Sequence, residues 1–399
     1  MKAEKMKKIR MMIVCGTRPE IIKMAPVYHA LRASRHFSPV VVHTGQHTEL
    51  AMPLYQSFRM LPERILTLQR CQGTLSHLTG SLLTGVSQTL EELRPAALLV
   101  HGDTASAMAA ALAGFYARTP VGHVEAGLRT YSRYSPFPEE MNRSVIGRLA
   151  DWHYAPTPAA RQALLGEGIC DSRIVMTGNT GIDAALQMVK SLSGTDSLPA
   201  VVTQHDLSQR LAGRRLLLVT AHRRENWGEG LMQIARAVDA LLSRYDDLFV
   251  VWPLHANPAV SQSIRHALAH RCGNDGALLL CPPLDYPSLI WLQHHAWLAL
   301  TDSGGIQEES AALGTPVLIL RDTTERPELV SAGGGILVGA DCARICDAVR
   351  QLNENPDVWS GMKNIQNPFG DGMAAGRIVS HLETVLSCDV QDTGSKNDE

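Results

Sequence analysis

The turn from Asp302 to Glu309 contains the residue types and spacing that most directly indicate ligand chemistry. It follows the apolar run 297–300 and precedes an expected helix. Its two adjacent glycines would let backbone N–H groups approach an anion where the helix dipole favours negative charge. Carboxylates one turn further along could accept hydrogen bonds from sugar hydroxyls. The pattern favours a diphosphate and ribose site, and its alternative is an ordinary helix start with Ser303 as the N-cap.

Ionisable side chains also follow other apolar, strand-like runs. They are Arg18, Lys23, Asp103, Glu125 with Arg129, His222 and His255. Ligands of open parallel sheets bind outside the carboxyl ends of the strands, so these groups would meet at one edge of each sheet. Each has a structural alternative, since Asp103 could cap a helix and Glu125 could pair with Arg129. Their shared position at strand ends favours a ligand cleft lined by carboxylates and cations.

The segment 136–143 adds a further carboxylate and a further cation. Two prolines fix a turn, and Glu139 and Arg143 then lie four residues apart on the helix that should follow. One interpretation is a surface ion pair that contributes about 0.2–0.5 kcal/mol. The other is a carboxylate held and tuned by a guanidinium at the edge of the cleft.

A metal site is not indicated, although the chain has 16 histidines. No HExxH motif or comparable ligand spacing is present. Asp103 and Glu125 are accompanied by arginine and lysine side chains, which suit an anionic ligand better than a cation. The sequence therefore predicts no metal.

The elements that must position these residues are short apolar strands separated by helices. The expected strands are residues 9–14, 40–42, 97–100, 121–124, 216–219, 248–251, 277–280, 297–300 and 316–320. Strands without polar alternation indicate parallel sheets covered on both faces. The pattern restarts after residue 190, and the segment 190–200 is rich in Ser, Gly, Thr and Pro, as expected of a loop near a domain boundary. We predict an α/β fold of two Rossmann-like, doubly wound domains facing across a cleft.

Composition agrees with this class. A chain of 399 residues is long enough for two domains, and 45% hydrophobic with 19% charged residues is typical of globular proteins. A net charge of −2 gives no electrostatic footprint for nucleic acid. No apolar run is long enough for a signal peptide or a membrane span. Eight scattered cysteines without a CxxC pair indicate reduced thiols, and we expect a cytoplasmic protein.

Eight motifs, in order, carry a resemblance to a known family. They are 16–20 with Lys23, 44–47, 101–104, 125–129, 138–143, 222–226, 302–309 and 324–328. With them, the chain from about residue 8 to about residue 385 resembles the non-hydrolysing UDP-N-acetylglucosamine 2-epimerases of bacteria and archaea. The resemblance implies the glycosyltransferase-B architecture, commonly as a homodimer. It implies domains at 1–187 and 188–373, a C-terminal helix at about 374–387 that returns to the first domain, and a disordered tail at 388–399.

The resemblance also implies an activity. Family members interconvert UDP-N-acetylglucosamine and UDP-N-acetylmannosamine for cell-surface polysaccharides, by eliminating UDP to give 2-acetamidoglucal and adding it back, with no cofactor. The implied catalytic residues are Asp103, Glu125, Glu139, Arg143 and His222. The implied substrate-binding residues are Arg18, Lys23, Ser303, Gly304, Gly305, Glu309 and Arg326. A second UDP-N-acetylglucosamine near residues 44–49 would act as an allosteric activator.

One departure from the family concerns the base. Well-known members carry glutamine where Leu284 stands and phenylalanine where Leu289 stands, and these help to hold the uracil. Leucine can neither hydrogen-bond nor stack, so a UDP-2,3-diacetamido uronic sugar is an alternative substrate. Three further alternatives are a retaining glycosyltransferase of the same architecture, a hydrolysing 2-epimerase and a non-catalytic sugar-nucleotide sensor.

Overall fold

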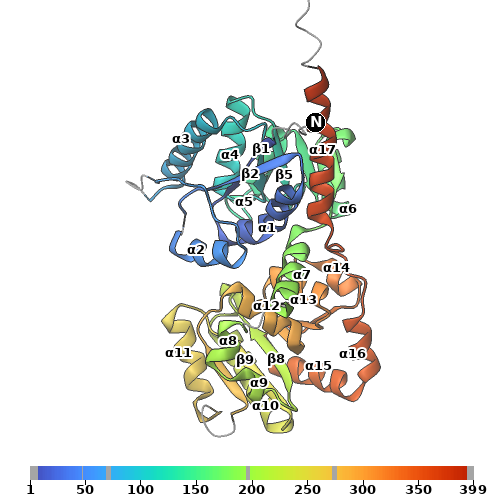
Figure 1. Ribbon diagram of the computed structural model, residues 1–399. Helices are drawn as coiled ribbons and strands as arrows, with labels where there is room; N and C mark the ends of the chain where they lie inside the picture. Colours follow the sequence, from blue (N-terminus) through green and yellow to red (C-terminus); the bar gives the residue numbers. More distant parts are fainter. Residues whose placement is uncertain (1–7, 47, 69–72, 195–197, 272–275, 393–399) are drawn as a thin grey trace, which may run out of the picture. The chain divides into compact units, whose positions relative to one another are not determined.

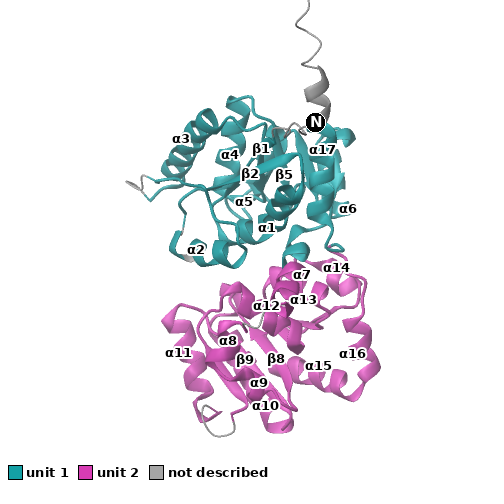
Figure 2. Cartoon of the chain, viewed as in Figure 1, with its two compact units in different colours: residues 1–184, 370–399 teal, residues 185–369 magenta. Residues whose placement is uncertain are grey.

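The computed structural model describes residues 8–46, 48–68, 73–194, 198–271 and 276–392. The chain divides into two compact units, one formed by residues 1–184 with 370–399 and the other by residues 185–369 (Figure 2). They are called unit 1 and unit 2 below. The sequence placed the changes of domain at 187/188 and 373/374, and the chain changes units at 184/185 and 369/370.

Unit 1 is built on a parallel sheet of seven described strands in the order β3-β2-β1-β4-β5-β6-β7. Figure 1 labels β1, β2 and β5 of this sheet. The strands are β1 (Ile9–Cys15), β2 (Phe37–His43), β3 (Arg64–Ile65), β4 (Ala97–His101), β5 (Val121–Val124), β6 (Trp152–Ala155) and β7 (Ile174–Met176). Its helices are α1 (Arg18–Ala33), α2 (Thr48–Ser57), α3 (Leu75–Leu93), α4 (Ala105–Tyr116), α5 (Glu139–Leu149), α6 (Pro158–Gly166), α7 (Thr180–Ser193, which continues into unit 2) and α17 (Ala374–Asp392).

Both faces of this sheet are covered. In β1, Met12 and Val14 pack into an apolar cluster with side chains of α3, α4 and α5. Met11 and Ile13 alternate with them and are equally inaccessible to solvent, so they are buried on the opposite face. This explains why β1 is an apolar run without polar alternation.

Unit 2 has a parallel sheet of six described strands in the order β10-β9-β8-β11-β12-β13. The strands are β8 (Arg215–Thr220), β9 (Leu248–Pro253), β10 (Leu278–Cys281), β11 (Ala296–Thr301), β12 (Val317–Ile319) and β13 (Gly335–Leu337). The helices are α8 (Ala200–Gln204), α9 (Leu207–Arg210), α10 (Glu229–Arg244), α11 (Pro258–Ala267), α12 (Tyr286–His295), α13 (Gly304–Leu313), α14 (Pro327–Ser331), α15 (Cys342–Glu354) and α16 (Pro356–Lys363). Leu217 and Leu218 of β8 belong to different apolar clusters, so this sheet is also buried on both faces. The predicted α/β class with two doubly wound parallel sheets is confirmed.

The C-terminal helix α17 packs against α1 of unit 1 (Figure 1). Its first two N–H groups, of Ala374 and Ala375, donate to the buried Asp183 carboxylate at 3.3 and 2.9 Å. Further along, Glu383 accepts a hydrogen bond from the Ser34 hydroxyl at 2.6 Å. The helix runs to Asp392, past the expected end at 387, and residues 393–399 of the predicted tail lie outside the described residues.

The strand order reverses at one place in each sheet. In unit 1 it reverses between β1 and β4, and in unit 2 between β8 and β11. Loops after neighbouring strands diverge at such a point, and ligands of doubly wound sheets bind there. Within the described residues, no helix is long and apolar enough to cross a membrane.

Candidate functional site

The loop after β4 carries an ion pair between two predicted catalytic residues. Arg143, on α5, donates from Nη2 to Oδ2 of Asp103. The neighbouring Asn142 amide donates to the backbone carbonyl of Asp103 at 2.8 Å, which fixes the loop to the same helix. Only 28% of the Asp103 side chain and 12% of the Arg143 side chain are exposed. Asp103 is therefore held in place by a cation, and it does not cap α4, whose N-cap is Thr104.

The loop after β5 carries a second carboxylate–cation pair. Glu125 accepts from the Lys23 ammonium, and its Oε2 lies 3.5 Å from Nε2 of His101. Burial alone would raise the pKa of Glu125, but Lys23 and His101 outweigh it and hold that pKa well below its ordinary value. Glu125 also has a φ of +62°, a left-handed backbone conformation that is uncommon for residues other than glycine. Such strain is found preferentially at functional positions.

Arg129 does not pair with Glu125, which was the structural alternative for these residues. Its guanidinium instead makes two hydrogen bonds to the carboxylate of Glu167, at 2.6 and 2.9 Å. Of the side chains described so far, Lys23 and His101 are therefore the ones that contact the Glu125 carboxylate.

Glu139 begins α5 and is partly exposed, but the interpretation that Arg143 holds it is wrong. Arg143 is paired instead with Asp103. Its Nη1 lies 3.4 Å from Oε2 of Glu140, the residue that follows Glu139. Glu140 is buried and accepts the N–H groups of Thr130 and Tyr131 at 2.9–3.1 Å, so it ties the loop after β5 to α5. Glu139 and Glu140 are adjacent in the chain, but only Glu140 is buried and accepts backbone N–H groups.

A further buried carboxylate was missed from the sequence. Glu20 is 1% exposed and accepts hydrogen bonds from the N–H groups of Gly16 and Thr17 and from the Thr104 hydroxyl. Burial raises the pKa of Glu20 against these donors. The hydrogen bonds of Glu20 thus connect the loop after β1 with the loop after β4. They lie next to the exposed Arg18 at the start of α1. The signal was present, because Thr17 and Glu20 form the spacing of a capping box.

In unit 2, the turn after β11 leaves helical N–H groups without partners inside the helix. The first backbone bond of α13 runs from Gln307 N–H to Ser303 O at 3.2 Å, so the N–H groups of Gly304 and Gly305 precede it. The N–H of Ser303 donates to the Thr301 hydroxyl at 3.0 Å, and the Ser303 hydroxyl does not cap the helix. Ser303 is therefore the N-cap residue by position, as the alternative expected, but its side chain does not cap α13, so the first N–H groups of the helix are left as at an anion-binding helix start.

Arg326 lies beside this helix start. A Cβ placed on Gly304 would be 3.7 Å from the Arg326 guanidinium carbon. The Nε of Arg326 donates to Glu308, which is buried on the first turns of α13 and fixes the guanidinium there. The Arg326 guanidinium and the positive end of the α13 dipole therefore lie close together, and both favour an anion there. The expected ribose ligand Glu309 accepts a hydrogen bond from the Gln293 amide at 2.9 Å.

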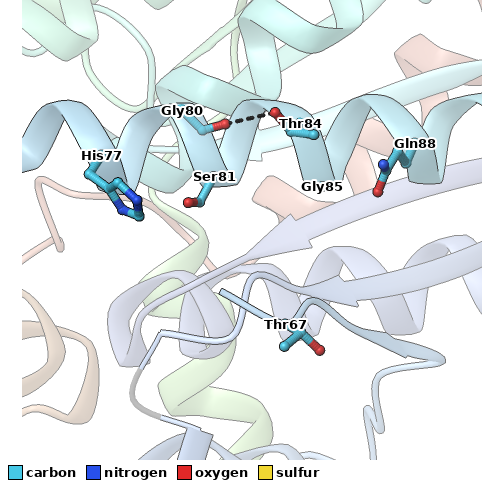
Figure 3. A pocket seen from close by; sticks show the side chains of 7 residues that line it. All are labelled: Thr67, His77, Gly80, Ser81, Thr84, Gly85 and Gln88. Atoms are coloured by element: carbon cyan, nitrogen blue, oxygen red, sulfur yellow. Dashed lines mark hydrogen bonds between the residues drawn. The ribbon is translucent and has the colours of Figure 1, made fainter. Parts of the chain in front are cut away.

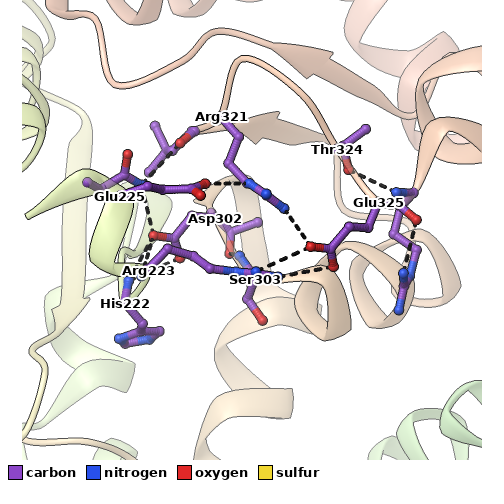
Figure 4. A network of polar contacts seen from close by, with 12 residues as sticks. His222, Arg223, Glu225, Asp302, Ser303, Arg321, Thr324 and Glu325 are labelled. Carbon is purple, nitrogen blue, oxygen red and sulfur yellow. Dashed lines mark hydrogen bonds and ion pairs between the residues drawn. The ribbon is translucent and has the colours of Figure 1, made fainter. Parts of the chain in front are cut away.

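The loop after β8 contributes His222, whose ring centroid lies 6.2 Å from that of His255. Burial lowers the pKa of the His222 imidazole from its ordinary value, the Asp302 carboxylate opposes this, and His255 adds to it. Figure 4 shows the neighbouring polar network, in which Asp302 accepts the N–H of His222. In the same network the Arg223 guanidinium bonds to Glu325 at 3.2 and 3.3 Å.

The leucines that depart from the family pattern have a structural role. Leu284 and Leu289 are partly buried and pack against the apolar cluster that α8 and α12 form with the sheet of unit 2. Both side chains help to pack α12 against the sheet, and neither has a group that could hydrogen-bond a base.

One cavity lies apart from these residues. A cavity of about 390 Å³ on α3 is lined by Thr67, His77, Gly80, Ser81, Thr84, Gly85 and Gln88 (Figure 3). None of these is a predicted site residue. In the described part of the chain, no group of three or more His, Cys, Asp or Glu side chains could hold a metal ion.

Comparison with known proteins gives full-length similarity. A family model described as UDP-N-acetylglucosamine 2-epimerase matches residues 29–383. A UDP-N-acetylglucosamine 2-epimerase of Escherichia coli is 42% identical over 379 residues, 94% of this chain and 98% of that protein. The crystal structure of UDP-GlcNAc 2-epimerase from Neisseria meningitidis bound to UDP-GlcNAc is 39% identical, with a TM-score of 0.82, over 94% of this chain and 100% of that chain. The Methanocaldococcus jannaschii UDP-GlcNAc 2-epimerase in complex with UDP-GlcNAc and UDP is 30% identical, with a TM-score of 0.73, over 94% and 100%.

Proposed function

The chain belongs to the UDP-N-acetylglucosamine 2-epimerase family, whose members are isomerases, and we propose that it interconverts UDP-N-acetylglucosamine and UDP-N-acetylmannosamine by eliminating UDP and adding it back. The proton at C2 of the sugar is not acidic, so its direct removal would face a prohibitive barrier. Elimination avoids this barrier because the C1–O bond to the diphosphate breaks as the C2 proton leaves. Return of the proton to the other face of 2-acetamidoglucal, with readdition of UDP at C1, gives the epimer.

Unit 2 would hold the leaving group. The N–H groups of Gly304 and Gly305 and the guanidinium of Arg326 supply positive charge at one place, where the diphosphate gains charge as the C1–O bond breaks. The uncapped Ser303 hydroxyl and the Glu309 carboxylate would complete the nucleotide contacts. Because Glu308 already fixes Arg326, little reorganisation is needed when the charge develops.

Unit 1 would carry the proton transfers. Glu125 is paired with Lys23, which holds its carboxylate in the ionised form, and the Asp103 carboxylate is held in place by Arg143. Glu139 makes no ion pair or side-chain hydrogen bond with another described residue, so it is available to the sugar. Inversion at C2 needs acid and base groups on both faces of the ring, and several carboxylates meet that need. Arg143, Lys23 and His222 would support the charges.

The observation that carries the proposal is the pair formed by Glu125 and Lys23. A nucleotide-binding helix start such as α13 would serve a retaining glycosyltransferase equally well. A carboxylate with a strained backbone, held ionised by Lys23 beside His101, is in the form that can accept a proton. A glycosyltransferase has no need of such a group together with Asp103.

Incubation with UDP-N-acetylglucosamine alone in D2O tests the proposal. We expect deuterium to enter C2 of both epimers, which ¹H NMR detects as loss of the C2 proton signal. A glycosyltransferase would leave the C2 proton in place without an acceptor, a hydrolysing enzyme would release free N-acetylmannosamine, and a sensor would bind without turnover. The same assay with a UDP-2,3-diacetamido uronic sugar decides between the two substrates that Leu284 and Leu289 leave open.

Three associated proposals rest on the family alone. The protein would act as a homodimer, and sedimentation would test this. A second UDP-N-acetylglucosamine near residues 44–49 would activate it; His47 in that segment lies outside the described residues. Activation predicts a rate that rises more steeply than in proportion to the substrate. The product would serve cell-surface polysaccharide synthesis, so deletion of the gene should remove N-acetylmannosamine from the surface glycans.

A further inference from the structure

The carboxylate of Asp302 stands at the reversal of strand order in unit 2 but is closed to substrate, since it is 0% exposed. It accepts the N–H of His222 at 2.9–3.0 Å and the N–H of Arg223 at 2.9 Å. It also accepts from the Asn226 amide at 2.9 Å. A buried carboxylate is an acceptor only, and here each donor that faces it comes from the loop after β8.

Asn226 extends this arrangement to a third strand. The same side-chain nitrogen also donates to the carbonyl of Leu320, directly after β12, at 3.1 Å. Thr220 and Thr301 are the last residues of β8 and β11. Their hydroxyls are 2.6 Å apart and connect the ends of the two strands. The ends of three neighbouring strands are therefore connected through buried polar groups, with Asp302 at the centre.

We propose that Asp302 is a positioning residue that fixes the loop carrying His222 against the helix start at Ser303. Asp302 is the residue next to Ser303 in the chain, so its backbone belongs to the anion-binding turn while its side chain belongs to the loop after β8. This single residue sets the distance between the imidazole and the diphosphate-binding N–H groups. The inference rests on the proposed function only for its kinetic consequence, because the geometry is independent of the substrate.

Charge adds a second effect that a purely structural residue would lack. Among the described groups, the titratable side chains that act on His222 are Asp302, directly after β11, and His255 from the loop after β9. Asp302 favours the imidazolium and His255 disfavours it. Removal of the Asp302 charge should therefore lower the pKa of His222 further below its ordinary value.

Asp302→Asn tests the proposal, because it keeps the side-chain shape but turns an N–H donor toward the donors of the loop. Histidine titrations by NMR of ¹³C-labelled protein, with the His222 signal assigned by its loss in His222→Gln, give the first readout. We expect a lower His222 pKa and a kcat for C2 exchange reduced at least tenfold. The Kd for UDP should change less than threefold, because the N–H groups of Gly304 and Gly305 remain.

Thr315→Val is the matched control. Thr315 is also buried in unit 2 and donates to the Gln293 carbonyl at 2.6 Å, but it makes no contact with the loop after β8. It should lower the Tm without moving the His222 titration. If Asp302→Asn does not fold, Asn226→Ala replaces it: the loop loses its amide link while the carboxylate stays, so kcat should fall with the His222 pKa unchanged.

The outcomes separate this inference from the proposed function. A His222 titration and a kcat that are both unchanged in Asp302→Asn, or a loss that merely follows the Tm as in Thr315→Val, would overturn the positioning role. For the replacement variant, a kcat equal to that of the wild type overturns it. If the wild-type protein exchanges no C2 proton but the His222 pKa still falls in Asp302→Asn, the proposed function fails and the positioning role stands.

Discussion

The ion pair between Lys23 and Glu125 allows a prediction whose size follows from the structure. Solvent reaches only 16% of the Lys23 side chain and 13% of the Glu125 side chain. At about 4 Å and an effective dielectric constant of about 20, opposite charges attract by about 4 kcal/mol, or roughly 3 pKa units. Shifts caused by one neighbouring charge are about 1–3 units. Lys23→Met should therefore raise the pKa of Glu125 from its lowered value.

The assay is the pH dependence of kcat/KM for C2 exchange. If the ionised Glu125 carboxylate is a base, the acid limb of the profile moves to higher pH in Lys23→Met. Arg32→Met is the control, since Arg32 is an exposed cation on the same helix and should leave the limb in place. An acid limb that does not move in Lys23→Met, whatever happens to the rate, would refute the base role of Glu125.

Stability should show the same linkage with a defined sign. The folded-state pKa of Glu125 is lowered, so the stabilisation from this pair is present above the unfolded-state pKa of about 4.3. It is lost as the pH falls through the lower folded-state pKa. In urea unfolding, the free energy of unfolding of Lys23→Met should therefore not show this loss of stabilisation at acid pH. An identical pH dependence of unfolding in both proteins would argue against a depressed Glu125 pKa.

Three further predictions follow from the contacts. Glu139→Gln should stop C2 exchange at an unchanged Tm. Glu140→Gln should lose about 1–3 kcal/mol of unfolding free energy, as measured by urea unfolding, because an NH2 donor replaces one of the two oxygens that accept the N–H groups of Thr130 and Tyr131; equal stability losses would contradict the separation. Arg326→Met should weaken UDP binding by about 1.5–3 kcal/mol in calorimetry, and Arg344→Met, which removes an exposed cation of the same unit, should not. Asp183→Asn should lower the free energy of unfolding by about 1–3 kcal/mol, because it weakens the hydrogen bonds that hold the first N–H groups of α17. C2 exchange should be retained at 25 °C.

The sequence predicted the strands that are buried on both faces. Runs such as 9–14 and 216–219 carry enough apolar residues to be recognised, and they lie inside β1 and β8. The strands β3, β6, β7 and β13 were missed. Of these, β3 has two residues that are both exposed, β7 and β13 have three each with mixed burial, and β6 contains the polar His153. An outer strand buries less surface, so its pattern resembles that of a loop.

The positions of site residues were predictable only as far as strand ends. Residues such as Asp103 follow strands whose order fixes their edge of the sheet, so the pattern in the sequence carries the information. Which carboxylate pairs with which cation was not accessible, because Arg143 could reach Glu139 by helical spacing and Asp103 only through the fold. Buried acceptors such as Glu20 and Asp302 were hidden for the same reason, since their donors come from distant loops.

The central claim is that the C1–O bond to UDP breaks reversibly during epimerisation. The most direct measurement uses UDP-N-acetylglucosamine with ¹⁸O in the bridge between C1 and the β-phosphorus, followed by ³¹P NMR during turnover. Free rotation of the released β-phosphate would move the label into the non-bridging positions, and we expect this scrambling on the timescale of epimerisation. Epimerisation with the label retained in the bridge would contradict elimination and with it the role assigned to the helix start at Ser303.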